Sequence, residues 1–220
     1  MYSLCLQEAS GGDMSKVIIF GNKDFAQLAH FYLTQDSEHE VVAFTMDQDY
    51  ITEPEFLGLP MVAFEQLTTL YPPDQYKLFI PMSYAKLNEH RIQKYKQGKT
   101  LGYQFISYIS SKATYYGTPV GENCFIFENN VIQPFTSIGN NVILWSGNHI
   151  GHHSSIADHV FIASHVVISG HVAIGEGCFI GVNATINNSI SIGKFNIISS
   201  GALIHKSTLD YDIYKAPRAE

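Results

Sequence analysis

The chain has 220 residues, 45% of them hydrophobic, which is enough for one large or two small domains with real cores. Its net charge of −7 and its scattered Lys and Arg argue against a nucleic-acid-binding surface. No stretch is apolar for long enough to span a bilayer, and the N-terminus lacks the basic and apolar segments of a secretion signal. The three cysteines, Cys5, Cys124 and Cys178, lack metal-ligand spacing, so we expect reduced thiols in a cytoplasmic protein.

The first half of the chain alternates strand-like and helix-like patterns. Strands are predicted over 16–20, 41–45, 61–63 and 77–80. Helices are predicted over 24–35, near 64–71, and from about 84 to 97, ending before Gly98. This alternation predicts a small parallel sheet of Rossmann type over residues 14–105. Residues 1–13 are expected to be an extension outside the fold.

The second half, residues 106–220, carries a hexapeptide repeat. An aliphatic residue occupies every sixth position from Val120 to Ile204, fifteen in all. Helices repeat every 3.6 residues and strands every 2, so this period predicts a solenoid. Three hexapeptides would form one triangular coil, and about five coils would stack at the strand spacing of roughly 4.8 Å. Small residues two places earlier, such as Cys124 and Cys178, should also point inward.

Two other residue types recur at fixed places in the repeat. Glycine often follows the aliphatic residue, where we expect a turn to need a permissive backbone: Gly121, Gly139, Gly151, Gly175, Gly181 and Gly193. Histidines at 153, 159, 165 and 171 all lie three places after an aliphatic residue, which predicts corners of the coil. His171 lies one coil beyond His153, near enough to share a metal ion, but no third ligand is indicated. We therefore expect no metal.

Three short motifs carry a family resemblance. Ile150-Gly151-His152, Ile156-Ala157-Asp158 and Ile168-Ser169-Gly170 resemble the signature of the sugar acyltransferases related to sialic acid O-acetyltransferases and to bacillosamine and perosamine N-acetyltransferases. The resemblance covers about residues 14–217. It implies a homotrimer in which a Rossmann-like nucleotide-sugar-binding domain precedes a left-handed parallel β-helix, with acetyl-CoA as acyl donor. It also implies that His152 is the catalytic base, a task that suits an imidazole titrating near pH 7.

The chain departs from that signature near His152. Where an acidic residue commonly follows the family's base and orients it, this sequence has His153. A second family histidine falls on Phe161, and a Pro-Gly pair falls on Ser164-His165. The orienting partner of His152 therefore stays open. His165 is a candidate replacement for the second histidine, and both His153 and His165 are candidates for the substrate side of the site.

The resemblance also supplies candidate binding residues. In that family acetyl-CoA lies in the groove between subunits, and the cofactor candidates here are Gly170, Gly181, Val182, Ser199 and Ser200. Acceptor candidates at the carboxyl ends of the predicted strands are Gly21, Asn22, Lys23, Asp47, Pro81 and Ser83. Only one of the three glycines of a dinucleotide motif is present, so NAD binding is not predicted. The helix that follows can still face an anion with its N-terminus.

The flanks of the predicted triangular coil are mostly uncharged and carry several apolar residues, which favours assembly. These residues would be exposed to water in a monomer, so we expect them to pack between subunits: Phe125, Val131, Ile143, Phe161, Val167, Phe179 and Ile197.

The hypothesis that follows is an acetyl-CoA-dependent acyltransferase acting on the amino group of a nucleotide-linked deoxyaminosugar for surface glycan synthesis. His152 would take the proton as the amine attacks the thioester directly. O-acetylation of a sugar hydroxyl, as on a sialic acid, is an open alternative, because nothing in the sequence separates nitrogen from oxygen acceptors. A non-catalytic β-helix scaffold is a further alternative. So is a γ-carbonic-anhydrase-like protein, although no two histidines here have that class's five-residue spacing.

Overall fold

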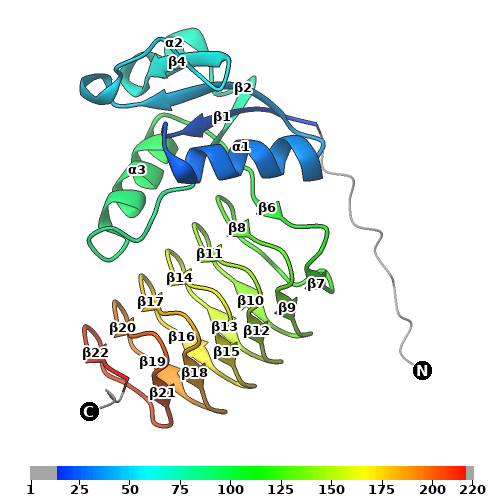
Figure 1. Ribbon diagram of the computed structural model, residues 1–220, viewed down its shortest axis with the longest axis vertical. Coiled ribbons are helices and arrows are strands. Elements are labelled where there is room, and N and C mark those ends of the chain that lie inside the picture. Colours follow the sequence, from blue (N-terminus) through cyan, green and yellow to red (C-terminus); the bar gives the residue numbers. More distant parts are fainter. Residues whose placement is uncertain (1–13, 217–220) are drawn as a thin grey trace.

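The computed structural model describes residues 14–216, so the extension expected over 1–13 lies outside the described residues. Figure 1 shows an α/β unit stacked on one end and side of a β-helix. Over 14–216, none of the helices has the length and apolar character needed to cross a membrane.

The α/β unit is built on a mainly parallel sheet. Strands β1 (Lys16–Phe20), β2 (Glu40–Met46), β4 (Leu59–Ala63) and β5 (Tyr76–Phe79) pair in parallel in the order β4-β2-β1-β5. They are connected through α1 (Asp24–Asp36), η1 (Gln48–Tyr50), η2 (Phe64–Gln66) and α2 (Leu67–Leu70). These elements confirm the predicted parallel sheet. Strand β3 (Glu55–Phe56), antiparallel to β4, was not predicted, because it is two residues long and joins β4 through a tight turn at Leu57 and Gly58.

The last helix of this unit, α3 (Glu89–Thr100), differs from its prediction at both ends. It cannot begin at residue 84, because Lys86, Leu87 and Asn88 all have positive φ. It also runs through Gly98 instead of stopping there. A Cβ on Gly98 would lie 2.7 Å from the Phe105 ring, so this glycine provides room for packing and does not end the helix.

The second unit is a triangular β-helix of three parallel sheets, called here its first, second and third faces. The first face contains β6 (Tyr108–Ile109), β8 (Phe125–Ile126), β11 (Ile143–Leu144), β14 (Phe161–Ile162), β17 (Phe179–Ile180), β20 (Ile197–Ile198) and β22 (Ile213–Tyr214). The second contains β7 (Thr114–Tyr115), β9 (Val131–Ile132), β12 (His149–Ile150), β15 (Val167–Ile168), β18 (Thr185–Ile186) and β21 (Leu203–Ile204). The third contains β10 (Ser137–Ile138), β13 (Ser155–Ile156), β16 (Ala173–Ile174) and β19 (Ser191–Ile192).

The register of these faces confirms the hexapeptide prediction. Equivalent residues pair 18 positions apart, so that Leu144 on β11 lies beside Ile162 on β14. The repeated aliphatic residues form the core, with Cys124 and Cys178 buried beside them as free thiols. Stacked parallel strands of this kind fit a left-handed β-helix. The chain passes from the first unit to the second between Phe105, which bridges to Leu78, and the start of β6.

From Val120 to Ile198, the residue three places after each repeated aliphatic residue lies at a corner of the coil and has a left-handed backbone conformation. The first corner, between the third and first faces, carries Asn123, Asn141, His159 and Gly177; the second carries Asn129, Gly147, His165 and Asn183; the third carries Gly117, Phe135, His153 and His171. The φ angles of the four histidines are 58°, 66°, 58° and 57° in chain order, which confirms that they are corner residues.

The role expected for the repeated glycines was wrong. Gly151, Gly175 and Gly181 are not left-handed; a Cβ on them would lie 2.5, 2.7 and 2.5 Å from atoms of the next coil's backbone. They are needed because successive coils approach closely, and the left-handed positions are held by the corner residues instead.

The first face is covered by the α/β unit of the same chain. Phe125, Ile143 and Phe161 are at most 2% exposed, and the Phe25 ring of α1 packs on Phe161. The expectation that these three residues form a subunit interface is therefore wrong, since the α/β unit of the same chain already buries them. On the second face Val131 and Val167 are exposed.

A fully buried arginine joins the two units. The guanidinium of Arg91 on α3 donates to the carbonyl oxygens of Asn141 and His159 at the first corner and to Asn88 Oδ1. Asn88 Nδ2 in turn donates to the carbonyl of Gly177, 2.9 Å away. Burial lowers the pKa of Arg91 to about 9. These bonds satisfy the two corner carbonyls and the two terminal guanidinium nitrogens, while Arg91 Nε is buried without a partner, and they hold α3 against the β-helix.

Candidate active site

His152 lies on the turn that follows β12, and its side chain is exposed. Its backbone N–H donates to Gln133 Oε1 on the preceding coil, at 2.9 Å. Its imidazole lies over Gly170 of the following coil, where a Cβ would come within 2.7 Å of Cε1 and 2.8 Å of Nε2. The imidazole can therefore occupy this position only because Gly170 has no side chain. Of the predicted cofactor residues, Gly170 is the one that the structure brings to His152.

His153 is hydrogen-bonded to His152. The two Nδ1 atoms lie 3.0 Å apart, so one ring donates a proton to the other. When His152 is the donor, its Nε2 carries a free lone pair. The ring of His153 is itself held between Phe135, with centroids 4.7 Å apart, and His171, at 4.8 Å and nearly parallel. His153 thus contacts His152 from the position where the family commonly has an acid.

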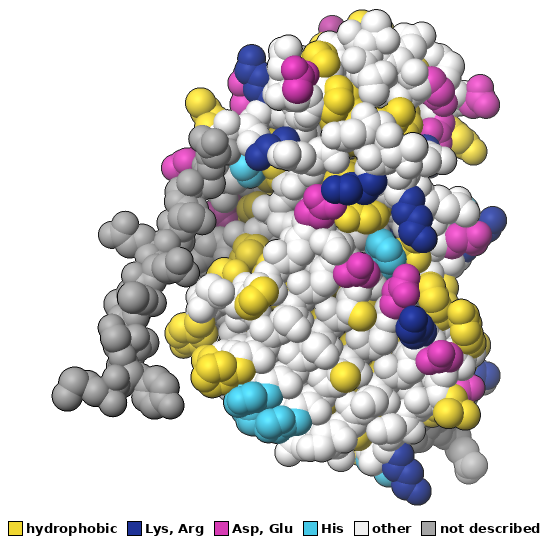
Figure 2. Space-filling view, turned by 180° about the vertical axis from the view of Figure 1, so that it is seen from behind, with side chains coloured by type: hydrophobic (Ala, Val, Ile, Leu, Met, Phe, Trp, Pro, Cys, Tyr) yellow, Lys and Arg dark blue, Asp and Glu magenta, His cyan; other side chains and the backbone are white. Residues whose placement is uncertain are grey.

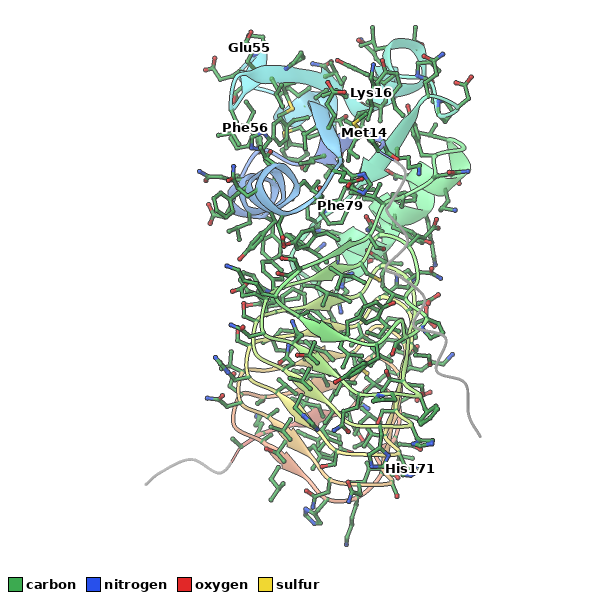
Figure 3. The ribbon with its side chains drawn as sticks, turned by 90° about the vertical axis from the view of Figure 1, so that its right-hand side faces the viewer. Met14, Lys16, Glu55, Phe56, Phe79 and His171 are labelled. Atoms are coloured by element: carbon green, nitrogen blue, oxygen red, sulfur yellow. The ribbon has the colours of Figure 1, made fainter. Side chains whose placement is uncertain are left out.

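His171 completes a group of three exposed histidines. One nitrogen from each of His152, His153 and His171 lies within 4.8 Å of the others. Figure 2 shows histidine side chains gathered at one edge of the molecule beside hydrophobic ones, and Figure 3 places His171 in the lower half of the β-helix. The expectation that His153 and His171 have no third nitrogen ligand nearby was wrong, because the turn brings His152 alongside them.

The other two corner histidines lie elsewhere. His159 is buried at the first corner, where it is hydrogen-bonded to the Asn141 side chain at 2.9 Å. Burial, with a contribution from Arg91, lowers its pKa to about 4. His165 lies at the second corner over Gly147, where a Cβ would meet its ring at 2.6 Å. Within one chain His165 is therefore at a different corner from His152.

The remaining cofactor candidates share that second corner with His165. Gly181 and Val182 follow β17, and Ser199 and Ser200 follow β20 one coil later. A Cβ on Gly181 would lie 2.5 Å from the backbone nitrogen of Ser200, so the two coils are in close contact there. Val182 and Ser200 are exposed, and Ser199 is half-buried.

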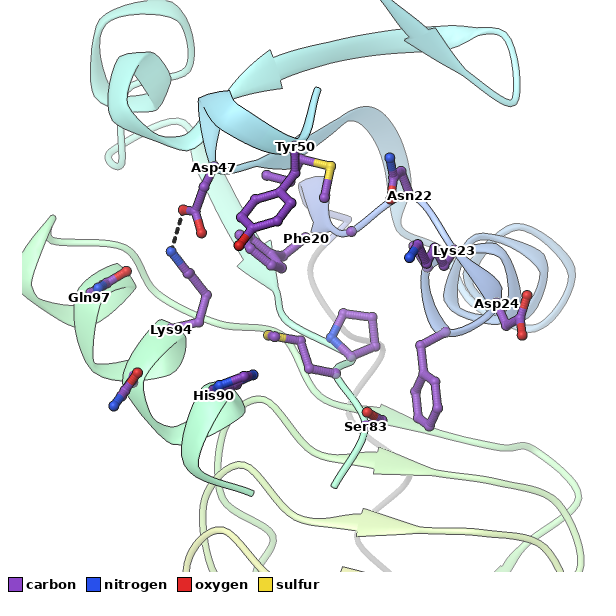
Figure 4. A pocket seen from close by; sticks show the side chains of 17 residues that line it. Phe20, Asn22, Lys23, Asp24, Asp47, Tyr50, Ser83, His90, Lys94 and Gln97 are labelled. Carbon is purple, nitrogen blue, oxygen red and sulfur yellow. Dashed lines mark hydrogen bonds and ion pairs between the residues drawn. The ribbon is translucent and has the colours of Figure 1, made fainter. Parts of the chain in front are cut away.

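The six acceptor candidates come together in the α/β unit. Gly21, Asn22, Lys23, Asp47, Pro81 and Ser83 all line one open pocket of about 770 Å³ (Figure 4). The N-terminus of α1 borders it, and Lys94 of α3 forms an ion pair with Asp47 inside it. His152 is not among the lining residues.

Sequence reasoning missed the contribution of α3 to this pocket. His90, Gln93, Lys94 and Gln97 all line it, together with Tyr50. Their spacing of three and four residues places them on one helix face, so the polar periodicity of α3 was an available signal.

Comparison with known proteins agrees with this architecture. Residues 135–170, which include His152, match the model of the bacterial transferase hexapeptide family, described as six repeats. No curated protein matches the chain significantly in sequence.

Several solved structures share the fold over nearly the whole chain. The acetyltransferase domain of PglB from Neisseria gonorrhoeae in complex with acetyl coenzyme A is 19% identical, with a TM-score of 0.81 over 91% of this chain and 96% of that one. A histidine-to-asparagine variant of perosamine N-acetyltransferase from Caulobacter crescentus, in complex with CoA and GDP-perosamine, is 18% identical, with a TM-score of 0.78 over 93% and 99%. WeeI from Acinetobacter baumannii is 19% identical, with a TM-score of 0.65 over 90% and 94%. The expected resemblance to hexapeptide-repeat sugar acyltransferases is thus confirmed in the repeat and the fold.

Proposed function

We propose that this protein transfers the acetyl group of acetyl-CoA to the amino group of a nucleotide-linked deoxyaminosugar, with His152 as general base. The observation that carries the proposal is the environment of His152. Its exposed imidazole is seated over Gly170 and hydrogen-bonded through Nδ1 to His153. With His152 as the donor, that bond orients the ring and leaves the Nε2 lone pair to act on a substrate.

In the proposed reaction the sugar nitrogen attacks the thioester carbonyl carbon, and His152 Nε2 takes the proton that the nitrogen loses. The tetrahedral intermediate then expels the CoA sulfur, which receives a proton and leaves as the thiol. A positioned base of this kind contributes about 10² to 10⁴ in rate. His153 holds the imidazole in the required orientation and tautomer, the task expected of the missing acid.

The pocket of the α/β unit is the proposed site for the nucleotide portion of the acceptor. Its volume of about 770 Å³ suits a nucleotide-sized ligand. The N-terminus of α1 and the side chain of Lys23 supply positive potential for a diphosphate, whereas the charge of Lys94 is offset by Asp47. A relative of the same fold was solved with GDP-perosamine, which supports an aminosugar carried by a nucleotide.

The proposed enzyme is a cytoplasmic homotrimer. The pocket, the second corner with Gly181 and Ser199, and the third corner with His152 lie at different places around one chain. Residues from separate corners can act on one acetyl-CoA and one sugar only if neighbouring copies contribute them. The exposed second face, with Val131 and Val167, is available for that contact.

The test is an acceptor screen. Release of free CoA thiol from acetyl-CoA is measured with UDP-, dTDP- and GDP-linked aminosugars, with the matching hydroxyl sugars, and with free sialic acid. The proposal expects acceptor-dependent thiol release with at least one nucleotide-linked aminosugar and an amide product by mass spectrometry. An ester product would instead establish the O-acetyltransferase alternative, and no transfer to any sugar would favour a scaffold.

A further inference from the structure

The three histidines at the third corner are arranged in a way that a general base alone does not require. His153 and His171 occupy equivalent corners of adjacent coils and stack with an interplanar angle of 17°. The backbone N–H of His171 donates to the carbonyl of His152 at 2.9 Å, so the backbone that carries all three side chains is held in place. Their rings are exposed, and their nitrogen atoms converge.

The separation between the nitrogens of His152 and His153 suits a shared metal ion. Two imidazole ligands at about 2.0–2.1 Å from one zinc ion lie about 2.9–3.4 Å apart for ligand angles of about 90–110°. The Nδ1 atoms of His152 and His153 are 3.0 Å apart, and the nitrogen of His171 lies within 4.8 Å of both. Because the His171 ring is stacked on His153, it must leave this stack and turn its nitrogen towards the ion to become the third ligand, and its exposure leaves it free to do so. A metal ion would replace the proton shared by the first two rings.

The ligand set also indicates which ions fit. Three neutral imidazoles without a carboxylate favour zinc, nickel or copper over magnesium or calcium. Because the rings are exposed, an ion has direct access and keeps at least one position for water.

We propose that His152, His153 and His171 form a binding site for a divalent transition-metal ion such as Zn²⁺, and that the bound ion inhibits acetyl transfer. Binding stands on the geometry alone. Inhibition rests on the proposed function, because the His152 imidazole is no longer a free, oriented base once one of its nitrogens ligates a metal. The ion is an inhibitor here and takes no part in the reaction.

The binding test uses the full chain without a polyhistidine tag. Isothermal titration with ZnCl₂ is expected to give one ion per chain, and His171→Asn is expected to weaken binding at least tenfold. Asparagine suits this position because Asn129, Asn141 and Asn183 occupy corners with the same left-handed conformation. The control is His165→Asn, an exposed corner histidine outside the cluster, which should bind zinc as the wild type does. No saturable binding, or equal binding by His171→Asn, would overturn the site.

The activity test separates this proposal from the enzymatic one. Zinc should inhibit the wild type at concentrations matching its Kd, EDTA should restore turnover, and His171→Asn should need at least tenfold more zinc for half-inhibition. If zinc binds as expected but no sugar is acetylated, the metal site stands and the proposed function fails. If transfer occurs but zinc inhibits wild type and His171→Asn equally, the ion acts elsewhere and the metal proposal fails.

Discussion

Replacing Gly170 with alanine tests whether the position of the His152 imidazole over Gly170 matters for turnover. The new Cβ would lie 2.7 Å from Cε1 and 2.8 Å from Nε2, and ordinary contact begins at 3.4 Å, so the ring must shift by about 0.7 Å. A misplacement of about 1 Å in a catalytic group can cost about a hundredfold. We therefore expect kcat to fall about 30- to 100-fold, and a hundredfold loss corresponds to about 2.7 kcal/mol of barrier.

The fold should tolerate this change. Gly170 does not have a left-handed backbone, so alanine suits its conformation, and the three atoms nearest the new Cβ all belong to the exposed His152 ring, which can move. The change can stabilise the chain by about 0.4–1 kcal/mol through the unfolded state. Thiol release from acetyl-CoA gives kcat and KM, and thermal unfolding gives Tm, with Ser169→Ala as the control on the same turn. A Gly170→Ala enzyme with turnover within threefold of wild type and a Tm no lower than that of the wild type would refute the role assigned to the space at Gly170.

Two further predictions concern the joint between the units. Arg91→Met removes the donors to the carbonyls of Asn141 and His159, which should destabilise the protein by about 3 kcal/mol and lower Tm by about 6–12 °C. The control is Gln93→Met, at an exposed position on the same helix, which should change Tm little. Equal Tm values for both variants would contradict the role of Arg91. The pKa of His159 is lowered to about 4, so protonation favours the unfolded chain, and stability should be lost as pH falls from about 6.5 towards 4. The shift predicts a loss of up to about 3 kcal/mol that His159→Asn escapes, as measured by urea unfolding at pH 7 and pH 4.5; parallel pH dependence in both proteins would show that another group is responsible.

The β-helix could be predicted because its signal is local and repeated. The side chains from Val120 to Ile204 enter one core at one period, so no knowledge of distant contacts was needed. The corner histidines followed from the same register. The reason for the glycines did not, because close approach between Gly151 and the backbone at Ser169 depends on how coils stack.

Contacts between distant segments explain the other differences. Phe125 and Phe161 look like surface residues within the repeat, and only the placement of α1 shows that they are buried. Gly98 stays inside α3 because Phe105 packs on it. The hydrogen bond between the Nδ1 atoms of His152 and His153, which supplies an orienting partner, depends on the turn geometry at a left-handed corner.

The most direct test of the account is the turnover of His152→Ala, measured together with its affinity for acetyl-CoA and its oligomeric state. We predict a loss of at least a hundredfold in kcat with the best acceptor, while the Kd for acetyl-CoA and the assembly stay as in the wild type. Turnover within a few-fold of wild type in an intact assembly would contradict the assignment of His152 as the base, and with it the mechanism proposed here.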